Sequence, residues 1–461
     1  MKNSFLYAII CSLALSCGNA PKETSQDEVM MDKNTETVSH TEWSKNATIY
    51  EVNIRQFTPE GTFSAFGESL PRLKEMGVKI LWLMPINPIG EKNRKGTKGS
   101  YYSVRDFKGI NPEFGNLDDF KALVKSAHDH DMKVIIDWVA NHSAFDNVWT
   151  ETNKDWYELD SAGALTPPHG TDWWDVAQLN YENAEMRVAM VDAMKYWVTE
   201  ADVDGFRCDV AEMVPMDFWM DCRAELEKVK PDVFMLAEGQ NPELHGAFDM
   251  TYAFEFLHLM NGIAKGEREL TDIDAFLENE TDQYQAEDYR MFFTTSHDEN
   301  SWNGTVFERY GKGHQTFAVL AFTIAGMPMV YSGQEAGMDY ALEFFEKDSI
   351  KWGNIELEGF YSSLLNLNRN NQALWNGEYG GELTRLKTDA DEAVYAFSRK
   401  RDNNEVVVIC NLKNTAVTAK LETVPSGDFT SLFDKHRFEQ LGKDGFELEP
   451  YGFHVFYRLD G

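Results

Sequence analysis

The sequence predicts an α/β protein: a (β/α)8 TIM barrel with a small domain inserted into it, followed by an antiparallel β-sandwich. Over residues 46–375, short apolar runs alternate with amphipathic helical stretches, which is typical of βα units and a parallel sheet. Four acidic residues close such runs in step with a barrel repeat. Beyond residue 376 the helical periodicity ceases and alternating, strand-like runs follow.

The N-terminus predicts an exported protein. An apolar run at residues 5–15 leads into Leu15-Ser16-Cys17-Gly18, which resembles a lipoprotein signal (residues 1–17) with Cys17 acylated; an ordinary secretory signal is the alternative. The run is too short to cross a bilayer, which takes about 20 residues. Residues 18–45 are polar and without periodicity, so we expect a flexible tether. The expected location is a bacterial membrane, on its periplasmic side or at the cell surface.

The first βα unit follows this segment. Residues 49–54 are expected to form the first strand, residues 69–76 the first helix and residues 79–84 the second strand. Gly77 stands where a helix commonly ends in the left-handed conformation. Further barrel elements are expected at residues 117–131 (helix), 185–199 (helix), 233–237 (strand), 290–296 (strand seven) and 326–335 (strand eight and its loop).

The acids that end apolar runs are spaced by the barrel repeat. A barrel of roughly 250 residues spends about 31 residues on each strand and helix. Glu238 lies 29 residues after Asp209, which is one repeat, and Asp298 lies 60 after Glu238, which is two. Asp137 precedes Asp209 by 72 residues, one repeat plus an excursion of about 40, which predicts the inserted domain at residues 141–182. Such acids converge on one mouth of the barrel, where its chemistry is kept.

The run that ends at Asp209 also carries an arginine. Residues two apart in a strand point the same way, so Arg207 and Asp209 share a face. Phe206 and Cys208 then point to the other face. We expect the arginine to lower the pKa of the Asp209 carboxyl and to fix its orientation. An ionised and oriented aspartate is what a nucleophile requires.

A single acid at a strand end has a plainer explanation. Strand-end Asp and Glu commonly cap helices or pair with lysine, and for one acid alone that reading is the better one. Four acids in register favour a shared site instead.

The C-terminal region, residues 376–461, predicts the β-sandwich. Alternating runs lie at residues 393–399, 406–412 and 453–458, separated by turn sequences such as Ser426-Gly427.

Four motifs occur in order along the chain: residues 137–142 (DWVANH), 205–209 (GFRCD), Glu238 and 297–298 (HD). Through them the sequence resembles the α-amylase family of retaining glycoside hydrolases over nearly all of the chain after about residue 46. The resemblance implies endo-acting hydrolysis of α-1,4-glucosidic bonds in starch-like α-glucans and maltooligosaccharides.

The resemblance also implies roles for particular residues. Asp209 would be the nucleophile, Glu238 the general acid and base, and Asp298 the third catalytic acid, which binds sugar hydroxyls. The residues implied to contact or orient the substrate are Tyr102, which stacks on the sugar in subsite −1, His142, Arg207 and His297. Asp137 and Asn141 are implied to be structural residues near the site.

Calcium is a further point of the comparison. Amylase calcium sites take an aspartate from the inserted domain, and in this sequence Gln178 stands at that place, while Asn141 matches another ligand. Losing a carboxylate weakens a site for a hard cation. We therefore expect that no cofactor is required. Calcium stays open, because Asp172 or Asp175 could supply the missing charge.

Two alternatives to an ordinary amylase remain. Residues 210–219 are closer to cyclomaltodextrinases and neopullulanases, because ordinary amylases carry Lys or His where Glu212 stands; an α-glucan transglycosylase belongs with this alternative. From another class comes a non-catalytic, membrane-tethered glycan-binding or transporter-accessory protein. Such relatives lose catalytic acids, whereas this chain keeps all three.

Composition excludes some partners. The 461-residue chain is 43% hydrophobic, enough for a large core and two or three domains. Its net charge of −33 argues against nucleic acid and against anionic membrane surfaces as partners. The expected partners are an α-glucan substrate and the membrane through Cys17, and the oligomeric state is open.

Overall fold

The computed structural model describes residues 38–353, 355–442 and 445–459. The predicted signal at residues 1–17 and most of the predicted tether lie outside these residues. Within the described part of the chain, no helix is both long and apolar enough to cross a bilayer.

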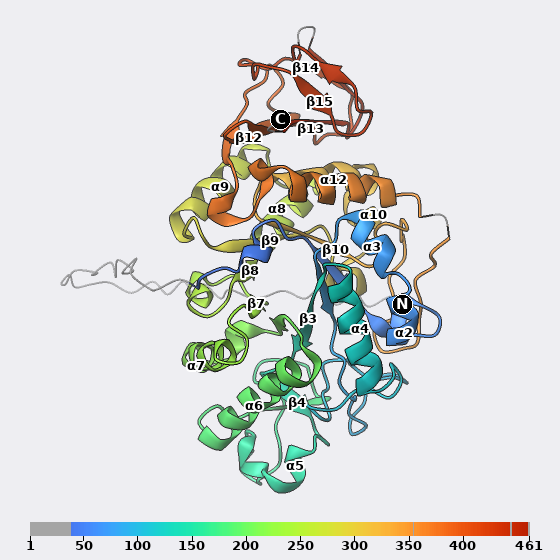
Figure 1. The fold of residues 1–461 in the computed structure, drawn as a ribbon, viewed down its shortest axis with the longest axis vertical. Coiled ribbons are helices and arrows are strands. Elements are labelled where there is room, and N and C mark those ends of the chain that lie inside the picture. The colour runs from blue at the N-terminus through green and yellow to red at the C-terminus, as the bar shows by residue number, and fades with distance from the viewer. Residues whose placement is uncertain (1–37, 354, 443–444, 460–461) are drawn as a thin grey trace, which may run out of the picture. The chain divides into compact units, whose positions relative to one another are not determined.

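Eight parallel strands close into a barrel, as predicted (Figure 1). Around the barrel the order is β1-β10-β9-β8-β7-β6-β3-β2, so each strand pairs with the next barrel strand in the sequence. The strands are β1 Ile49–Val52, β2 Ile80–Leu83, β3 Lys133–Trp138, β6 Gly205–Cys208, β7 Phe234–Ala237, β8 Met250–Tyr252, β9 Tyr289–Phe292 and β10 Met327–Tyr331.

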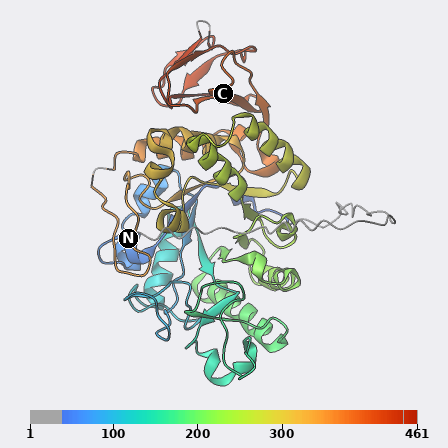
Figure 2. The same ribbon diagram turned by 180° about the vertical axis from the view of Figure 1, so that it is seen from behind.

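Helices follow the strands and lie outside them, as the views from both sides show (Figures 1 and 2). They are α1 Ile54–Phe57, α2 Phe63–Gly67, α3 Leu70–Met76, α4 Leu117–Asp129, α6 Ala184–Ala201, α7 Met216–Glu227, α8 Phe254–Lys265, α9 Thr271–Gln283, α10 Val306–Tyr310, α11 His314–Ile324 and α12 Glu358–Asn370. Local sequence sets their ends. Asn116 and Asp119 form a capping box at the start of α4, and Gly77 ends α3 in the left-handed conformation, as predicted (φ 101°).

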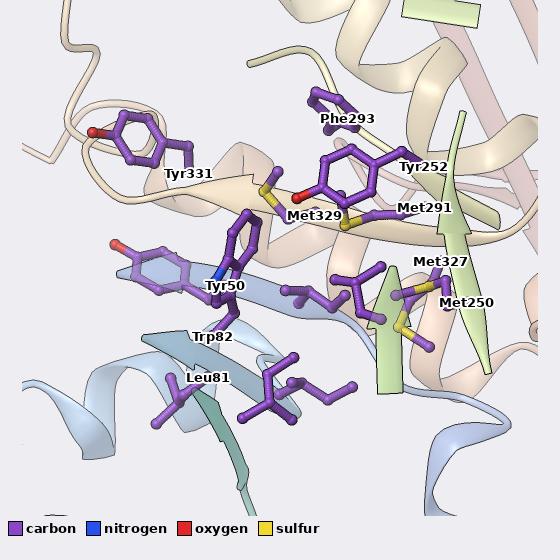
Figure 3. Close-up of a cluster of buried hydrophobic side chains, with 14 of the residues drawn as sticks. Tyr50, Leu81, Trp82, Met250, Tyr252, Met291, Phe293, Met327, Met329 and Tyr331 are labelled. Carbon is purple, nitrogen blue, oxygen red and sulfur yellow. The ribbon is translucent and has the colours of Figure 1, made fainter. Parts of the chain in front are cut away.

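Large side chains fill the space around the strands. Figure 3 shows Trp82 and Tyr252 near each other, beside the methionines of β8, β9 and β10. The Trp82 and Tyr252 rings meet edge to face, with centroids 6.3 Å apart. These rings lie directly beneath the site described below, because both also approach the Arg207 guanidinium.

The inserted segment follows β3 and contains a two-stranded antiparallel sheet. His142 of β4 (His142–Ala144) pairs with Gln178 of β5 (Val176–Gln178). A short helix α5 (Trp149–Thr152) lies between these strands. The sheet joins the end of β3 to the far end of the insert, which brings Asn141 and Gln178 together.

Antiparallel sheets make up the C-terminal region, as predicted. One sheet has six strands in the order β11-β12-β13-β18-β15-β16, and β14 pairs with β17 in a second. The strands are β11 Glu382–Arg385, β12 Val394–Arg401, β13 Asn404–Asn411, β14 Val417–Ala419, β15 Phe429–Ser431, β16 Arg437–Phe438, β17 Phe446–Leu448 and β18 Phe453–Arg458. Alternate residues of β13 enter two cores: Val406 and Val408 join the barrel's core, and Val407 joins the core between the sheets.

Residues 38–45, which the sequence assigned to the tether, pack against the barrel instead. The His40 ring stacks on Tyr289 with centroids 3.8 Å apart, and its Nδ1 lies 3.2 Å from Asp249. Trp43 packs against Phe234. The predicted tether therefore does not extend beyond Ser39.

Candidate active site

The site is organised around one buried guanidinium, that of Arg207 on β6. Its Nη1 donates to Asp137 Oδ1 at 2.9 Å and to Asp209 Oδ1 at 3.0 Å, and its Nη2 lies 2.9 Å from Glu238 Oε1. Strand pairing explains the arrangement, because Asp137 of β3 is in register with Arg207 and Glu238 follows the neighbouring strand β7. The predicted convergence of these acids is therefore found in the structure.

The predicted low pKa of Asp209 is wrong for this arrangement, although Arg207 does act in the predicted direction. Burial raises the pKa of Asp209 well above its ordinary value, the negative charge of Glu238 adds to the rise, and Arg207 only partly opposes it. Burial also raises the pKa of Glu238, against the effect of Arg207 and with that of Asp298. One guanidinium that is shared among three carboxylates stabilises each negative charge less than a cation paired with a single carboxylate would. Asp209 and Glu238 consequently titrate as a pair.

A strained residue connects the two carboxylates. Val210 follows Asp209 directly and has φ 38° and ψ 48°, a left-handed conformation that is unfavourable for a β-branched residue. In this conformation its backbone N–H donates to Glu238 Oε2 at 2.7 Å. The strain thus fixes the Glu238 carboxyl beside Asp209.

Asp298 lies on the other side of the mouth, beside His297. Asp298 Oδ2 is 3.2 Å from His297 Nε2, and 45% of the Asp298 side chain is exposed. The partial loss of water around its carboxylate opposes its charge, but the neighbouring His297 prevails and lowers the pKa of Asp298. His297 is buried and also contacts Glu51 of β1 through Nδ1.

Tyr102 links the two sides of the mouth. Its hydroxyl donates to Asp137 Oδ2 at 3.0 Å and lies 2.8 Å from His297 Nε2. Trp82 Nε1 donates to the same Asp137 oxygen at 3.1 Å. Asp137 therefore accepts from three side chains and is a fixed point of the network, whereas the Tyr102 ring face lies parallel to that of His297, 5.4 Å away.

His142 lies beside the Asp209 carboxylate, and unlike His297 its pKa is lowered. Its Nε2 is 4.0 Å from Asp209 Oδ2, and its Nδ1 contacts the Asn141 side-chain amide at 3.2 Å. Burial lowers the pKa of His142 to about 3, so the ring is neutral in the working range. The Trp173 ring of the insert packs against it at 5.5 Å.

Aromatic rings continue outward from Tyr102. Phe344 is nearly parallel to Tyr102, with centroids 6.3 Å apart, and Trp302 packs against Phe344 at 5.4 Å. Trp302 is 51% exposed and lies in the π-helical turn Glu299–Asn303 directly after Asp298. Exposed aromatic faces suit the apolar C–H faces of sugars, so Trp302 can extend the site.

At the place where the resemblance implies a calcium ion, the side chains of the insert already use the oxygens that such an ion would need. The Gln178 side-chain NH2 donates to Asn141 O at 3.0 Å, Asn141 Oδ1 at 3.1 Å and Leu179 O at 3.1 Å. A cation would need these same oxygens. Asp175 forms an ion pair with Lys95 at 2.9 Å, so its charge is already matched. Within the described residues, no three His, Cys, Asp or Glu side chains are grouped as a metal site.

Sequence reasoning missed two residues of the network. Tyr252 accepts from Arg207 Nε at 3.1 Å, but its strand β8 has only three residues, too few to show a period. Glu51 lies inside the apolar strand β1 and was not predicted to belong to the site. An acid in a buried strand is itself the signal that could have found it, because such a charge requires a partner.

Comparisons with known proteins agree with this geometry. Residues 31–358 match the family model described as "Alpha amylase, catalytic domain", and residues 383–455 match "Maltogenic Amylase, C-terminal domain". Among solved structures, an α-amylase from Lactobacillus plantarum superposes with a TM-score of 0.80 at 28% identity, covering 90% of this chain and 100% of that one. A noncanonic maltogenic α-amylase, AmyB, from Thermotoga neapolitana gives 0.79 at 28% identity, covering 90% and 97%.

Curated relatives include amylases and neopullulanases. The α-amylase MalA of Haloarcula japonica is 27% identical over 84% of this chain, which spans only 58% of that relative. Neopullulanase 2 of Thermoactinomyces vulgaris is 27% identical over 89% of this chain and 77% of the relative. Because the catalytic-domain model matches more than half of the sequence, the chain belongs to the α-amylase family.

Proposed function

We propose that this protein is a retaining glycoside hydrolase that cleaves α-1,4-glucosidic bonds in starch-like α-glucans and maltooligosaccharides. The observation that carries the proposal is the placement of Asp209 and Glu238. They stand directly after neighbouring barrel strands, share the Arg207 guanidinium and are largely buried, with 10% and 16% of their side chains exposed. A pair of carboxyl groups is what glycoside hydrolysis requires.

The reaction proceeds in two displacements. An Asp209 carboxylate oxygen attacks the anomeric carbon and forms a glycosyl ester, while Glu238 gives its proton to the departing glycosidic oxygen. Glu238 then takes a proton from water, the water oxygen attacks the same carbon, and the ester bond to Asp209 breaks. Asp298 binds sugar hydroxyls, and His142 and His297 donate toward the ring bound at the mouth, against which Tyr102 stacks.

A cyclomaltodextrinase or neopullulanase activity, or α-glucan transfer, is the second candidate. The C-terminal match to a maltogenic amylase domain favours it. So does Glu212, whose carboxylate accepts from the backbone N–H groups of Gln240 and Asn241 beside Glu238. Product analysis on starch, pullulan and cyclodextrin separates the two: faster hydrolysis of cyclodextrin or pullulan than of starch would favour the second candidate.

We further propose that the enzyme works without bound calcium, since Gln178 already supplies donors to the oxygens that a cation would need. EDTA should leave the melting temperature and activity nearly unchanged. In Gln178→Asp, which restores a carboxylate, added calcium should raise the melting temperature. A large EDTA-induced fall in the wild type, reversed by calcium, would contradict the proposal.

Export and lipid anchoring through Cys17 are also proposed, on the sequence alone. Cys17→Ser should move the protein from the membrane fraction to the soluble fraction of cells. Continued membrane association of this variant would overturn the anchor.

A further inference from the structure

Two buried histidines at the mouth differ in charge although each is only 3% exposed. Among the described residues, the carboxylate that lies within 4.0 Å of His142 is that of Asp209, at 4.0 Å, and burial lowers the pKa of His142 to about 3. His297 lies between Glu51 and Asp298; burial opposes its charge, but the two acids prevail and raise its pKa well above 6.5. The difference between the rings is therefore set by the carboxylates beside them.

Hydrogen bonding independently indicates that both nitrogens of His297 carry hydrogen. Nδ1 contacts Glu51 Oε1. On the opposite side, the Tyr102 hydroxyl gives its hydrogen to Asp137, so its oxygen is left to accept from His297 Nε2 at 2.8 Å. Asp298 Oδ2 lies beside the same nitrogen. A ring that donates at both nitrogens is an imidazolium.

Glu51 is fully buried in β1 and faces His297 with its whole carboxylate. The backbone N–H of His297 points at both Glu51 oxygens, at 3.4 and 3.3 Å, so these oxygens act as acceptors. Burial raises the pKa of Glu51, and the His297 charge opposes that rise. We assign the shared proton to the imidazole, because two carboxylates, those of Glu51 and Asp298, lie against the ring. Among the described residues His297 is the cation that pairs with Glu51, and Arg207 acts on it from further away.

We infer that Glu51 is a positioning residue of the proposed reaction: its buried carboxylate holds His297 as an imidazolium, and that cation holds the Asp298 carboxylate in place at the mouth. Glu51 acts on the site through His297 and does not itself touch the substrate. The inference rests on the proposed glycosidase function and adds a residue from the first barrel strand to the site.

Among the groups around His297, Glu51 is the charged one that can be substituted without changing a proposed catalytic or substrate-binding residue. Trp82 meets the ring edge to face at 6.0 Å and Phe344 lies 6.4 Å away, and both are uncharged. The charged groups that interact with the ring besides Glu51 are Glu238 after β7 and, on its own segment, Asp298; Asp137 on β3 reaches it through the Tyr102 hydroxyl, and Arg207 on β6 acts on the neighbouring Glu51 and Asp298. Asp298, Glu238 and Arg207 belong to the proposed substrate-binding and catalytic groups, and Asp137 holds Arg207 and Tyr102, whereas Glu51 contacts His297 alone among these groups.

The experiment compares pH profiles of kcat/KM on maltoheptaose. In Glu51→Gln, which keeps the shape and removes the charge, the His297 ring should lose its proton about one to three pH units lower. The value of kcat/KM should therefore fall at alkaline pH where Glu238 still holds its proton but the His297 ring has become neutral. Glu51→Asp keeps the charge and should keep the basic limb near its wild-type position. Glu335→Gln is the matched control, because Glu335 is equally buried but bonds to Arg72 and Tyr50.

A wild-type profile for Glu51→Gln, lowered uniformly at every pH, would overturn the inference, as would an equal shift in Glu335→Gln. The wild type supplies a readout that is independent of mutation and of activity: nitrogen chemical shifts of the histidine rings, with His297 identified by its loss in His297→Gln. His297 should remain an imidazolium at pH 8, and a neutral ring there would overturn the inference. Absence of any hydrolysis by the wild type would instead contradict the proposed function, and the ring shifts would still test Glu51.

Discussion

Strand β6 carries an aspartate at each end, and the two have opposite environments. Asp204, just before the strand, is fully buried and accepts from Lys133 Nζ at 2.8 Å, His128 Nε2 at 2.7 Å and the Val134 N–H at 2.9 Å. Burial opposes its charge, but these partners prevail and lower its pKa. Asp209, just after the strand, shares its arginine with two other acids, and its pKa is raised.

The difference separates stability from chemistry. A buried acid with several cationic and N–H partners favours the folded state, whereas a buried acid crowded by other acids is costly to fold in its ionised form, as is common at active sites. In barrels of this kind, the ends where the strands start serve stability and the ends where they finish hold the active site. The two ends of β6 follow that rule within five residues.

The largest expected effect is that of Asp209→Asn on turnover. Removing the nucleophile should lower kcat on maltoheptaose at least about 10⁴-fold. The fold should survive and the melting temperature should hold or rise, because the change removes an incompletely paired buried charge. Turnover near the wild-type value would sink the nucleophile assignment.

Asp204→Asn should produce the opposite result. It removes the anion that faces Lys133 and His128, so the free energy of unfolding should fall by on the order of 3 kcal/mol. The kcat of the folded protein should stay within about twofold of the wild type, since the change is at the far end of the strand. Denaturant titration measures the free energy of unfolding, and an assay well below the melting temperature measures kcat. A large loss of kcat in the folded variant would contradict the assignment of Asp204 to stability alone.

The contributions of Asp204 and Asp209 to stability should change in opposite directions as the pH rises. The folded-state pKa of Asp204 is lowered, so its contribution to stability is present above the unfolded value of about 3.9 and is lost as the pH falls through the folded value. For Asp209 the folded value is raised, so stability declines as the pH rises from the unfolded value to the folded one. Melting curves from pH 3 to 7 should show Asp204→Asn increasingly destabilised and Asp209→Asn increasingly stabilised relative to the wild type. Parallel curves would contradict the opposite shifts.

The smallest effect is expected for Lys133→Met. Asp204 keeps His128 and the Val134 N–H, and the Lys133 side chain is 23% exposed, so the loss in stability should be about 1–2 kcal/mol. Activity should not change. A loss as large as that of Asp204→Asn would mean that the lysine alone accounts for the pairing.

Much of the site could be predicted because its residues stand at strand ends, where spacing along the chain translates into position. Asp137, Arg207, Asp209 and Glu238 meet as the barrel repeat required. The pKa of Asp209 could not be predicted in the same way. The sequence shows only the arginine two residues away, and the acids that compete for it come from other strands.

Other features depended on contacts that no local pattern carries. Their polar composition predicted that residues 38–45 belong to a tether. In the structure, however, the His40 ring contacts the Asp249 carboxylate, which lies far along the chain. Strand β8, Met250–Tyr252, is held by pairing with β7 and β9 rather than by its own sequence. Glu51 has a clear role only once His297 is placed beside it.

The most direct test of the account is the configuration of the first product. Proton NMR of maltoheptaose hydrolysis, recorded before mutarotation is complete, distinguishes α from β at the new reducing end. Attack by Asp209 followed by attack of water inverts the anomeric carbon twice, so the account predicts that the α-anomer appears first. An initial β-anomer would mean a single displacement by water and would contradict the assignment of Asp209 as the nucleophile.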